Sequence, residues 1–196
     1  KGVATLNMLK KLASLSNPDY LTHDSEAIKV EWESGKVALM TLWASRSGTL
    51  LDDEGDAKIT AATKLTGPAT VGGGNIPAAT LWWDGFTLAK NRSDSDAEAT
   101  FIALAHAASN KKMVADAADQ AVWLVEGFVP GPKSIGVIEA VKMGAKPYPM
   151  LPQMGLMHGA LGSEIVEFLQ GKESAEQALK DVEAAYISKA KEQGFL

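Results

Sequence analysis

Helical patterns that alternate with short, continuous apolar runs are the feature that most constrains the fold of this chain. A helix that follows the start signal Asp24-Ser25 ends at Gly35, and the apolar run Val37 to Trp43 comes directly after it. A glycine is typical of the residue after a helix, and a continuous apolar run of this length is typical of a strand buried on both faces. The order of helix, glycine turn and buried strand predicts an α/β element.

A similar alternation of apolar runs and helical patterns recurs further along the chain. The apolar run Phe86 to Ala89 precedes a capping box at Ser95 to Glu98, which opens a helix whose apolar face includes Phe101 and Leu104. The Thr-rich run Lys58 to Leu65 is a further candidate strand. The sequence therefore predicts a fold of the α/β class.

Helical spacing of apolar residues predicts further helices outside this alternation. One begins with the first residues and stops at Asn17-Pro18, one covers about Leu156 to Leu169, and one begins at Ser174, whose capping box includes Gln177. Because the chain opens in helical register without a capping residue, we expect it to be a fragment of a larger protein.

Composition limits the classes of function. The net charge of −5 comes with lysines that are spread along the chain, which argues against a nucleic-acid surface. Cysteine is absent, which excludes disulfides and thiolate metal sites, and the three histidines have no metal-ligand spacing. We therefore expect neither a metal nor a cofactor. The sequence also contains no apolar run long enough to cross a bilayer.

The stretch Trp82-Trp83-Asp84-Gly85 is the candidate ligand site with the clearest chemistry. Two flat aromatic side chains offer a stacking face to the C–H surface of a sugar ring, and an ionised Asp84 accepts hydrogen bonds from hydroxyl groups. Tryptophan is most often a core residue, and adjacent residues of a strand point to opposite faces. We therefore expect one indole to contact the ligand and the other to pack.

Several short motifs occur in one order along the chain and together carry a family resemblance. They are Gly35-Lys36-Val37-Ala38-Leu39-Met40, Pro77-Ala78-Ala79-Thr80 before the two tryptophans, Leu88-Ala89-Lys90-Asn91, Pro152-Gln153-Met154, and Gly171 to Leu179. In this order they resemble the carboxy-terminal half of the extracellular solute-binding proteins of ABC importers, in the class that includes maltose-binding protein. The resemblance covers nearly the whole chain, from about Gly2 to Ile187.

The resemblance implies an α/β, two-lobe fold like that of type II periplasmic binding proteins, of which this chain is only the carboxy-terminal portion. Residues 1–62 would belong to the second lobe, residues 63–124 would return to the first, and residues 125–133 would form a hinge or crossing. Residues 134–196 would supply the carboxy-terminal helices of the second lobe. The resemblance also implies a monomer in the periplasm, or one anchored at the cell surface, that meets the membrane subunits of an ABC permease.

The family's ligand contacts come from the loop after the Gly-Lys strand, from the turn with the two tryptophans, and from the start of the helix after Pro-Gln-Met. Carried onto this sequence, the resemblance implies a site made of Trp43, Arg46, Trp82, Trp83, Asp84 and His158. Maltose-type relatives have an aromatic residue where His158 stands, and many members have small residues at the two tryptophans, which favours another sugar or a polyol as ligand. Trp43 could instead pack in the core, Arg46 could be solvated, and Asp84 could form an Asx turn.

The leading functional prediction is a non-enzymatic receptor that captures a sugar or polyol in a cleft between two lobes and delivers it to a permease. One alternative is a carbohydrate-active hydrolase with its acid and base among Glu126, Glu139 and Asp84, although no paired-carboxylate arrangement can be read from the spacing. The other alternative is a structural or interaction domain without a small ligand.

Overall fold

The computed structural model describes residues 1–52 and 54–196. The chain is 54% helical. Within the described residues one sheet is present, and it consists of two short parallel strands, β1 (Thr80–Leu81) and β2 (Lys146–Pro147). The prediction of an α/β, two-lobe fold like that of type II periplasmic binding proteins is therefore wrong, and the fold is mostly helical. Among the described helices, none combines the length and apolarity that a membrane span requires.

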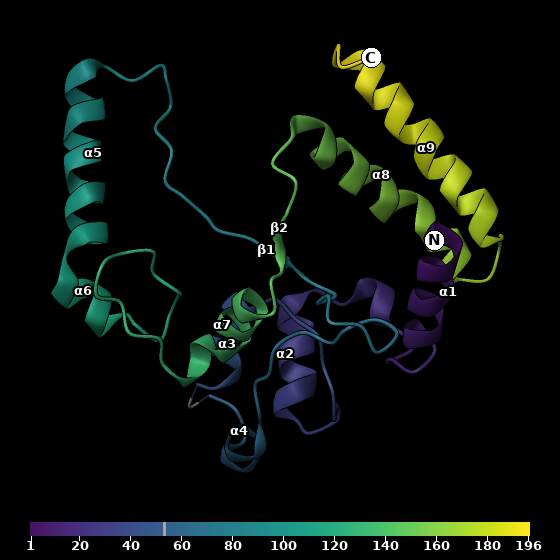
Figure 1. Cartoon of the computed structure of the whole chain (residues 1–196), viewed down its shortest axis with the longest axis horizontal. Helices are drawn as coiled ribbons and strands as arrows, with labels where there is room; N and C mark the ends of the chain where they lie inside the picture. The colour runs from purple at the N-terminus through teal and green to yellow at the C-terminus, as the bar shows by residue number, and fades with distance from the viewer. Residues whose placement is uncertain (53) are drawn as a thin grey trace. The chain divides into compact units, whose positions relative to one another are not determined.

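The chain forms two compact units. The first, here called the terminal unit, comprises Lys1–Ser25 and Pro149–Leu196, and the second, the central unit, comprises Glu26–Tyr148. The terminal unit contains the helices α1 (Gly2–Ala13), η1 (Tyr20–Thr22), α8 (Pro152–Leu169) and α9 (Ala175–Glu192). In Figure 1, α8 and α9 run side by side, and α1 lies at one end of the pair.

The core of the terminal unit lies where these three helices meet. Leu6 of α1, Phe168 of α8 and Ala178 of α9 are buried together with Ala175. The Lys10 ammonium lies 4.6 Å from the centre of the Phe168 ring and donates a 2.9 Å hydrogen bond to the Phe168 carbonyl oxygen. The Phe168 carbonyl oxygen also accepts a 2.9 Å hydrogen bond from the backbone N–H of Gly171, so the bond from Lys10 ties α1 to an already capped end of α8.

Pro152 and Ser174 lie at the starts of the two long helices of the terminal unit, and of the two the sequence predicts the Ser174 cap. Pro152 occupies the first turn of α8, where a missing N–H costs nothing. Ser174 caps α9 by accepting a 3.1 Å hydrogen bond from the backbone N–H of Gln177. The predictions of helices near the amino terminus, over Leu156 to Leu169 and from Ser174 are confirmed.

The central unit consists of helices of up to 16 residues joined by irregular segments. Its elements are α2 (Ser25–Glu33), η2 (Ala44–Arg46), α3 (Ser47–Leu50), α4 (Ala57–Ala62), β1, α5 (Asp94–Ser109), α6 (Lys111–Asp116), η3 (Pro132–Ser134), α7 (Ile135–Lys142) and β2. Ser47 is buried, and its hydroxyl lies within hydrogen-bond distance of the carbonyl oxygens of Ala44 and Lys133. This side chain therefore links η2 and α3 to η3.

The helices α2 and α4 pack against each other at the end of α2. The indole N–H of Trp32 donates a 3.1 Å hydrogen bond to the hydroxyl oxygen of Thr63. Gly35 follows α2 with a φ of 71°, and a Cβ at this position would lie 3.0 Å from the side chain of Ile59. Only glycine combines this conformation with so close a neighbour without strain, so the predicted glycine stop of α2 is confirmed.

Lys29 of α2 binds three carboxylates. Its ammonium lies 3.1 Å from Glu54, 3.2 Å from Asp52 and 3.5 Å from Glu33. These partners raise the pKa of Lys29, with the hydrogen bond to Glu54 as the largest cause. The pKa of Asp52 is lowered, chiefly because its carboxylate accepts a hydrogen bond from the backbone N–H of Glu54. The cluster ties the segment after α3 to α2.

Three predicted strands are absent from the structure. The run Val37 to Trp43 is irregular and largely exposed, with Leu39 at 91% exposure. The run Lys58 to Leu65 contains most of α4, and Phe86 to Ala89 is irregular. A strand needs a neighbour that completes its backbone hydrogen bonds, and an apolar run does not reveal whether such a neighbour is within reach.

The helix predicted after Phe86 to Ala89 is present as α5, but it begins before the predicted capping box. Its N-cap is Ser93, whose hydroxyl accepts a hydrogen bond from the backbone N–H of Asp96 at 3.2 Å. Ser95 and Glu98 therefore lie within the helix rather than at its cap.

Candidate functional site

The parallel strand pair brings two aromatic residues together from distant parts of the sequence. Thr80 is opposite Lys146 and Leu81 is opposite Pro147, and the backbone N–H of Tyr148 donates to the Leu81 carbonyl oxygen at 2.9 Å. Because the strands run in the same direction, the residues that follow them emerge at the same edge. These residues are Trp82 and Tyr148.

Local backbone structure leads the chain into each strand. Before β2, Gly144 closes α7 with a φ of 77°, and the Ala145 N–H donates to the Ala140 carbonyl oxygen at 3.0 Å. This is a Schellman turn, which needs the left-handed conformation that glycine adopts without strain. Before β1, a bridge joins Thr70 and Pro77 and turns the chain back toward the strand.

Trp82 is held in one orientation by two contacts. Its ring stacks on Tyr148, with ring centroids 3.8 Å apart and an angle of 25° between the planes. Its indole N–H donates a 3.0 Å hydrogen bond to the hydroxyl oxygen of Thr80. Trp82 nevertheless remains 54% exposed. The structure therefore presents a fixed indole to solvent, which lowers the entropic cost of binding a ligand on its open surface.

Trp83 and Asp84 follow Trp82 and face solvent. Trp83 is 51% exposed and Asp84 is exposed. Neither side chain has a hydrogen bond, ion pair or ring contact with the described residues. Trp82, Trp83 and Tyr148 are here called the aromatic platform. The platform combines flat apolar surface with a neighbouring carboxylate whose acceptor capacity is unused within the described chain.

Two further predicted residues, Trp43 and Arg46, lie in the central unit but outside the platform. Trp43 is 72% exposed and directly precedes η2, rather than ending a buried strand. The Arg46 guanidinium forms a 3.0 Å ion pair with Glu26. Within the described residues, no hydrogen bond, ion pair or ring contact joins either of them to Trp82, Trp83 or Asp84.

The sixth predicted residue, His158, lies on α8 in the terminal unit and is exposed. The platform, by contrast, belongs to the central unit. Of the six predicted residues, Trp82, Trp83 and Asp84 lie together in one local group. Tyr148, which the sequence analysis missed, stacks on Trp82 of this group. An aromatic residue inside the proline-rich stretch Pro147 to Pro152 was the available signal, but the parallel pairing that gives it a role could not be read from the sequence.

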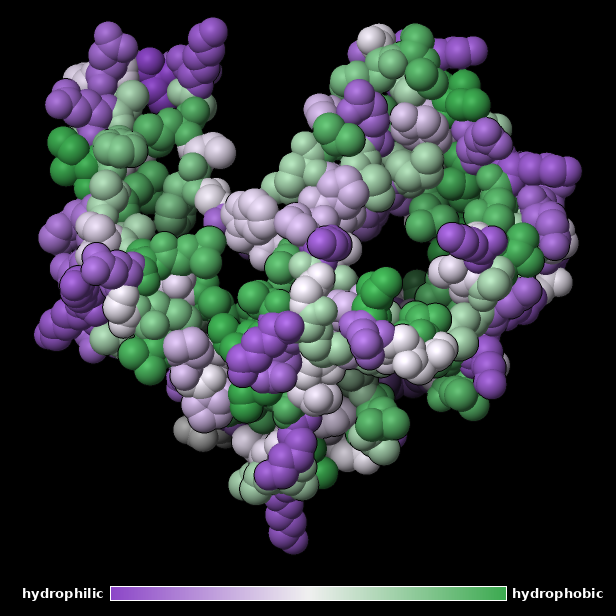
Figure 2. Space-filling view, viewed as in Figure 1, coloured by the Kyte–Doolittle hydropathy of each residue, from purple (hydrophilic) through white to green (hydrophobic). Residues whose placement is uncertain are grey.

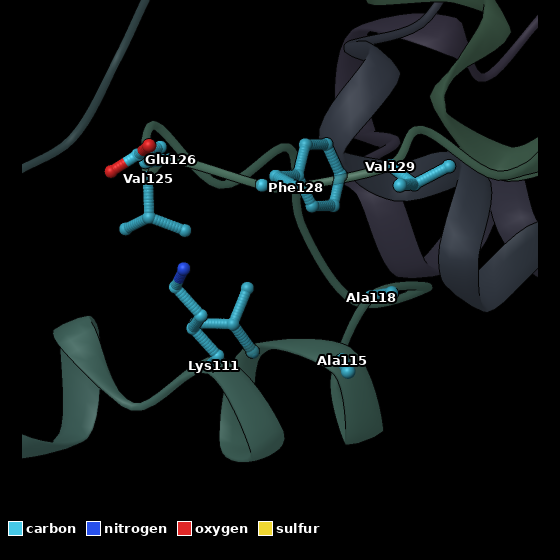
Figure 3. A pocket seen from close by; sticks show the side chains of 9 residues that line it. Lys111, Ala115, Ala118, Val125, Glu126, Phe128 and Val129 are labelled. Atoms are coloured by element: carbon cyan, nitrogen blue, oxygen red, sulfur yellow. The ribbon is translucent and has the colours of Figure 1, made fainter.

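Among the pockets formed by the described residues of the central unit are two that the platform residues do not line. A pocket of about 430 Å³ lies beside the other end of the strand pair and is lined by residues that include Asn75, Met143 and Lys146. A second pocket, of about 170 Å³, lies between α6 and the loop around Phe128. Figure 3 shows Lys111 extending from α6 toward Val125 on that loop. The two indoles of the platform are thus half exposed and line neither of these pockets.

The residues considered for an alternative hydrolase do not form a carboxylate pair through any described interaction. Glu139 is paired with Lys142 at 3.0 Å on α7, and Glu126 lines the pocket beside α6. Within the described residues, no group of three His, Asp or Glu side chains is arranged to hold a metal ion.

Comparison of the chain with protein-family models, with curated proteins and with solved structures gave no match.

Proposed function

We propose that this chain recognises a sugar or polyol on the aromatic platform without altering it chemically. The observation that carries the proposal is Trp82, which is fixed by Tyr148 and Thr80 and yet half exposed. An indole held in this way can stack on the C–H face of a sugar ring without first losing rotational freedom.

Polar groups beside the indole would supply specificity. The Asp84 carboxylate can accept hydrogen bonds from ligand hydroxyls, and charge-assisted bonds of this kind are stronger than those between neutral groups. Trp83 adds a second exposed apolar surface and an indole N–H that can donate to a ligand oxygen. These groups bind hydroxyls and C–H surfaces, and they provide no nucleophile held against a general base, which favours recognition over hydrolysis.

The wider role in this proposal is that of a receptor which delivers its solute to an ABC permease in the membrane. The support for delivery, and for residence in the periplasm or at the cell surface, is the ordered set of short motifs from Gly35-Lys36 to Gly171-Lys172. The binding step itself depends on the platform alone and can be tested without the permease.

Titration with a panel of monosaccharides, disaccharides and linear polyols tests the binding step. Intrinsic Trp fluorescence should change saturably, because a ligand that covers a half-exposed indole removes water from it. Product analysis by chromatography in the same samples should show unchanged ligand. Cleaved sugar would favour the hydrolase, and the absence of any saturable response across the panel would contradict the proposed function.

Variants of Tyr148 separate the stack from the hydroxyl group. Tyr148→Ala removes the ring that positions Trp82 and should weaken binding about threefold to tenfold, as expected for an aromatic pair worth roughly 0.5–1.5 kcal/mol. Tyr148→Phe keeps the ring and is the matched control. Trp123→Phe is the control for the origin of the fluorescence signal. The Trp123 indole lies outside the platform and donates to the Ala117 carbonyl oxygen, so a response that comes from the platform should persist in this variant.

A further inference from the structure

The pocket beside α6 combines an apolar interior with a cation at its edge. Val114 on α6 is 5% exposed, and Val125 and Phe128 on the facing loop are half-buried. Figure 3 shows the Lys111 side chain extending from α6 into the space between the helix and this loop. In Figure 2, apolar and hydrophilic side chains lie next to each other over α6 and the loop. The pocket therefore offers both an apolar surface and a positive charge to one small molecule.

Hydrogen bonds hold the loop wall of the pocket in place. The indole N–H of Trp123 donates to the Ala117 carbonyl oxygen at 3.0 Å, which ties the start of the loop to the residues that follow α6. The backbone N–H of Phe128 donates to the Val125 carbonyl oxygen at 3.2 Å, and Gly127 supplies the φ of 85° within this turn. A wall that is already ordered lowers the entropic cost of binding a ligand against it.

Lys111 determines the charge of the ligand that fits. This side chain is exposed, and within the described residues its ammonium forms no ion pair. Glu126 also lines the pocket, but Figure 3 shows its carboxylate pointing away from Lys111. A ligand carboxylate at the edge of the pocket can form a charge-assisted hydrogen bond with the ammonium and keep contact with water. An apolar tail of the same ligand leaves water when it enters the interior.

The volume of the pocket limits the size of that tail. The pocket measures about 170 Å³. A cavity of about 150 Å³ accommodates benzene, so a tail of about four to seven carbon atoms matches the available space. A branched or aromatic tail fills a compact space of this kind better than a linear chain, because more of its atoms contact the walls.

We propose that this pocket binds a small monocarboxylate with a branched or aromatic apolar tail, whose carboxylate pairs with Lys111. 4-Methylpentanoate and benzoate are members of this class. The site shares no lining residue with the aromatic platform, and the proposal does not depend on the proposed sugar binding. A ligand with so few atoms makes limited contact, so we expect a dissociation constant of about 1 mM.

Titration of the whole chain with 4-methylpentanoate tests the proposal. The methyl resonances of Val114, Val125 and Val129 should shift saturably in NMR spectra, because these side chains line the pocket. The uncharged 4-methylpentanamide has nearly the same shape and is the matched ligand. It should bind about tenfold more weakly, because it has no charge to pair with Lys111.

Three variants separate the charge from the apolar interior. Lys111→Met keeps an unbranched side chain and removes the charge, so it should weaken binding of the acid about tenfold and leave binding of the amide unchanged. Lys112→Met is the matched control, because Lys112 is adjacent on α6 but does not belong to the pocket lining, and it should change neither affinity. Ala115→Leu should fill the pocket and weaken the acid and the amide alike. Far-UV circular dichroism should show that the variants keep their helices.

Any of four results would overturn the proposal. The first is the absence of a saturable shift at these valine methyls up to about 50 mM acid. The second is equal affinity for the acid and the amide. The third is unchanged affinity of Lys111→Met for the acid, which would mean that the stem of this lysine only covers apolar surface. The fourth is an equal loss in Lys111→Met and Lys112→Met, which would indicate attraction to the general positive charge of α6.

Discussion

Truncating Phe168 is the sharpest test of how the terminal unit is held together. Phe168 is 3% exposed and packs against Leu6, Ala175 and Ala178. Phe168→Ala would leave a cavity among these residues and would remove the ring beneath the Lys10 ammonium. The hydrogen bond from Lys10 goes to the backbone carbonyl oxygen, so it can persist in the variant. The expected loss therefore comes from packing and from the cation–π contact.

The magnitude follows from the burial of the ring. Replacing a fully buried Phe by Ala typically costs about 3–5 kcal/mol, because the lost transfer free energy adds to the cost of the cavity. At about 0.05–0.15 kcal/mol per residue, a folded body of the size of the terminal unit has a total stability of roughly 4–11 kcal/mol. The substitution should thus remove a large share of that stability and lower the melting temperature by roughly 15 to 30 °C.

Thermal and urea unfolding followed by far-UV circular dichroism measure this loss, since α8 and α9 provide much of the helical signal. Phe195→Ala is the matched control, because Phe195 lies in the same unit but is 37% exposed. It should cost at most about 1–2 kcal/mol. A loss below about 1 kcal/mol for Phe168→Ala, or one equal to that of the control, would refute the packing described for α1, α8 and α9.

Three further perturbations test local features. Ser174→Ala should destabilise the chain by about 1 kcal/mol in urea unfolding, because it removes the hydroxyl that caps α9, and an unchanged midpoint would count against the cap. Gly35→Ala should cost about 1 kcal/mol or more because of its φ of 71°, whereas Gly155→Ala within α8 should be neutral or stabilising, and equal effects would contradict this distinction. The hydrogen bond from the Glu54 N–H holds the pKa of Asp52 below its ordinary 3.8. The stability that the ionised Asp52 contributes to the fold is therefore present above pH 3.8 and disappears as the pH falls through the lowered pKa. Asp52→Asn should therefore flatten the acid side of the stability curve measured by urea midpoints, and parallel curves would show that Asp52 has no such role.

Helices could be predicted from the sequence where caps and periodicity agreed. The helix after Ser174 has both a capping hydroxyl and a regular apolar stripe, and α9 begins at the expected residue. The glycine that ends α2 was also recognised. These signals are local, because a cap or a helical stripe is defined by residues within a few positions of one another.

The predicted strands were wrong because strand pairing, unlike a helix cap, depends on distant residues. Apolarity alone predicts a buried strand over Val37 to Trp43, yet within the described residues no strand lies beside this run. The strands that do form are two residues long, and β2 includes a proline, which no propensity scale would favour. Pairing depends on a second segment more than sixty positions away, and that information is absent from either segment by itself.

The candidate site shows the same difference between what neighbouring residues determine and what distant residues determine. The sequence by itself determined that Trp82, Trp83 and Asp84 would lie together, because neighbours in the chain cannot be far apart. Only the tertiary structure decided that Tyr148 would stack on Trp82 and that Trp43 and Arg46 would have no described contact with the group. Covalent connection fixes proximity over a few residues, whereas contacts between distant segments depend on which backbone groups pair and which apolar surfaces meet when the whole chain folds.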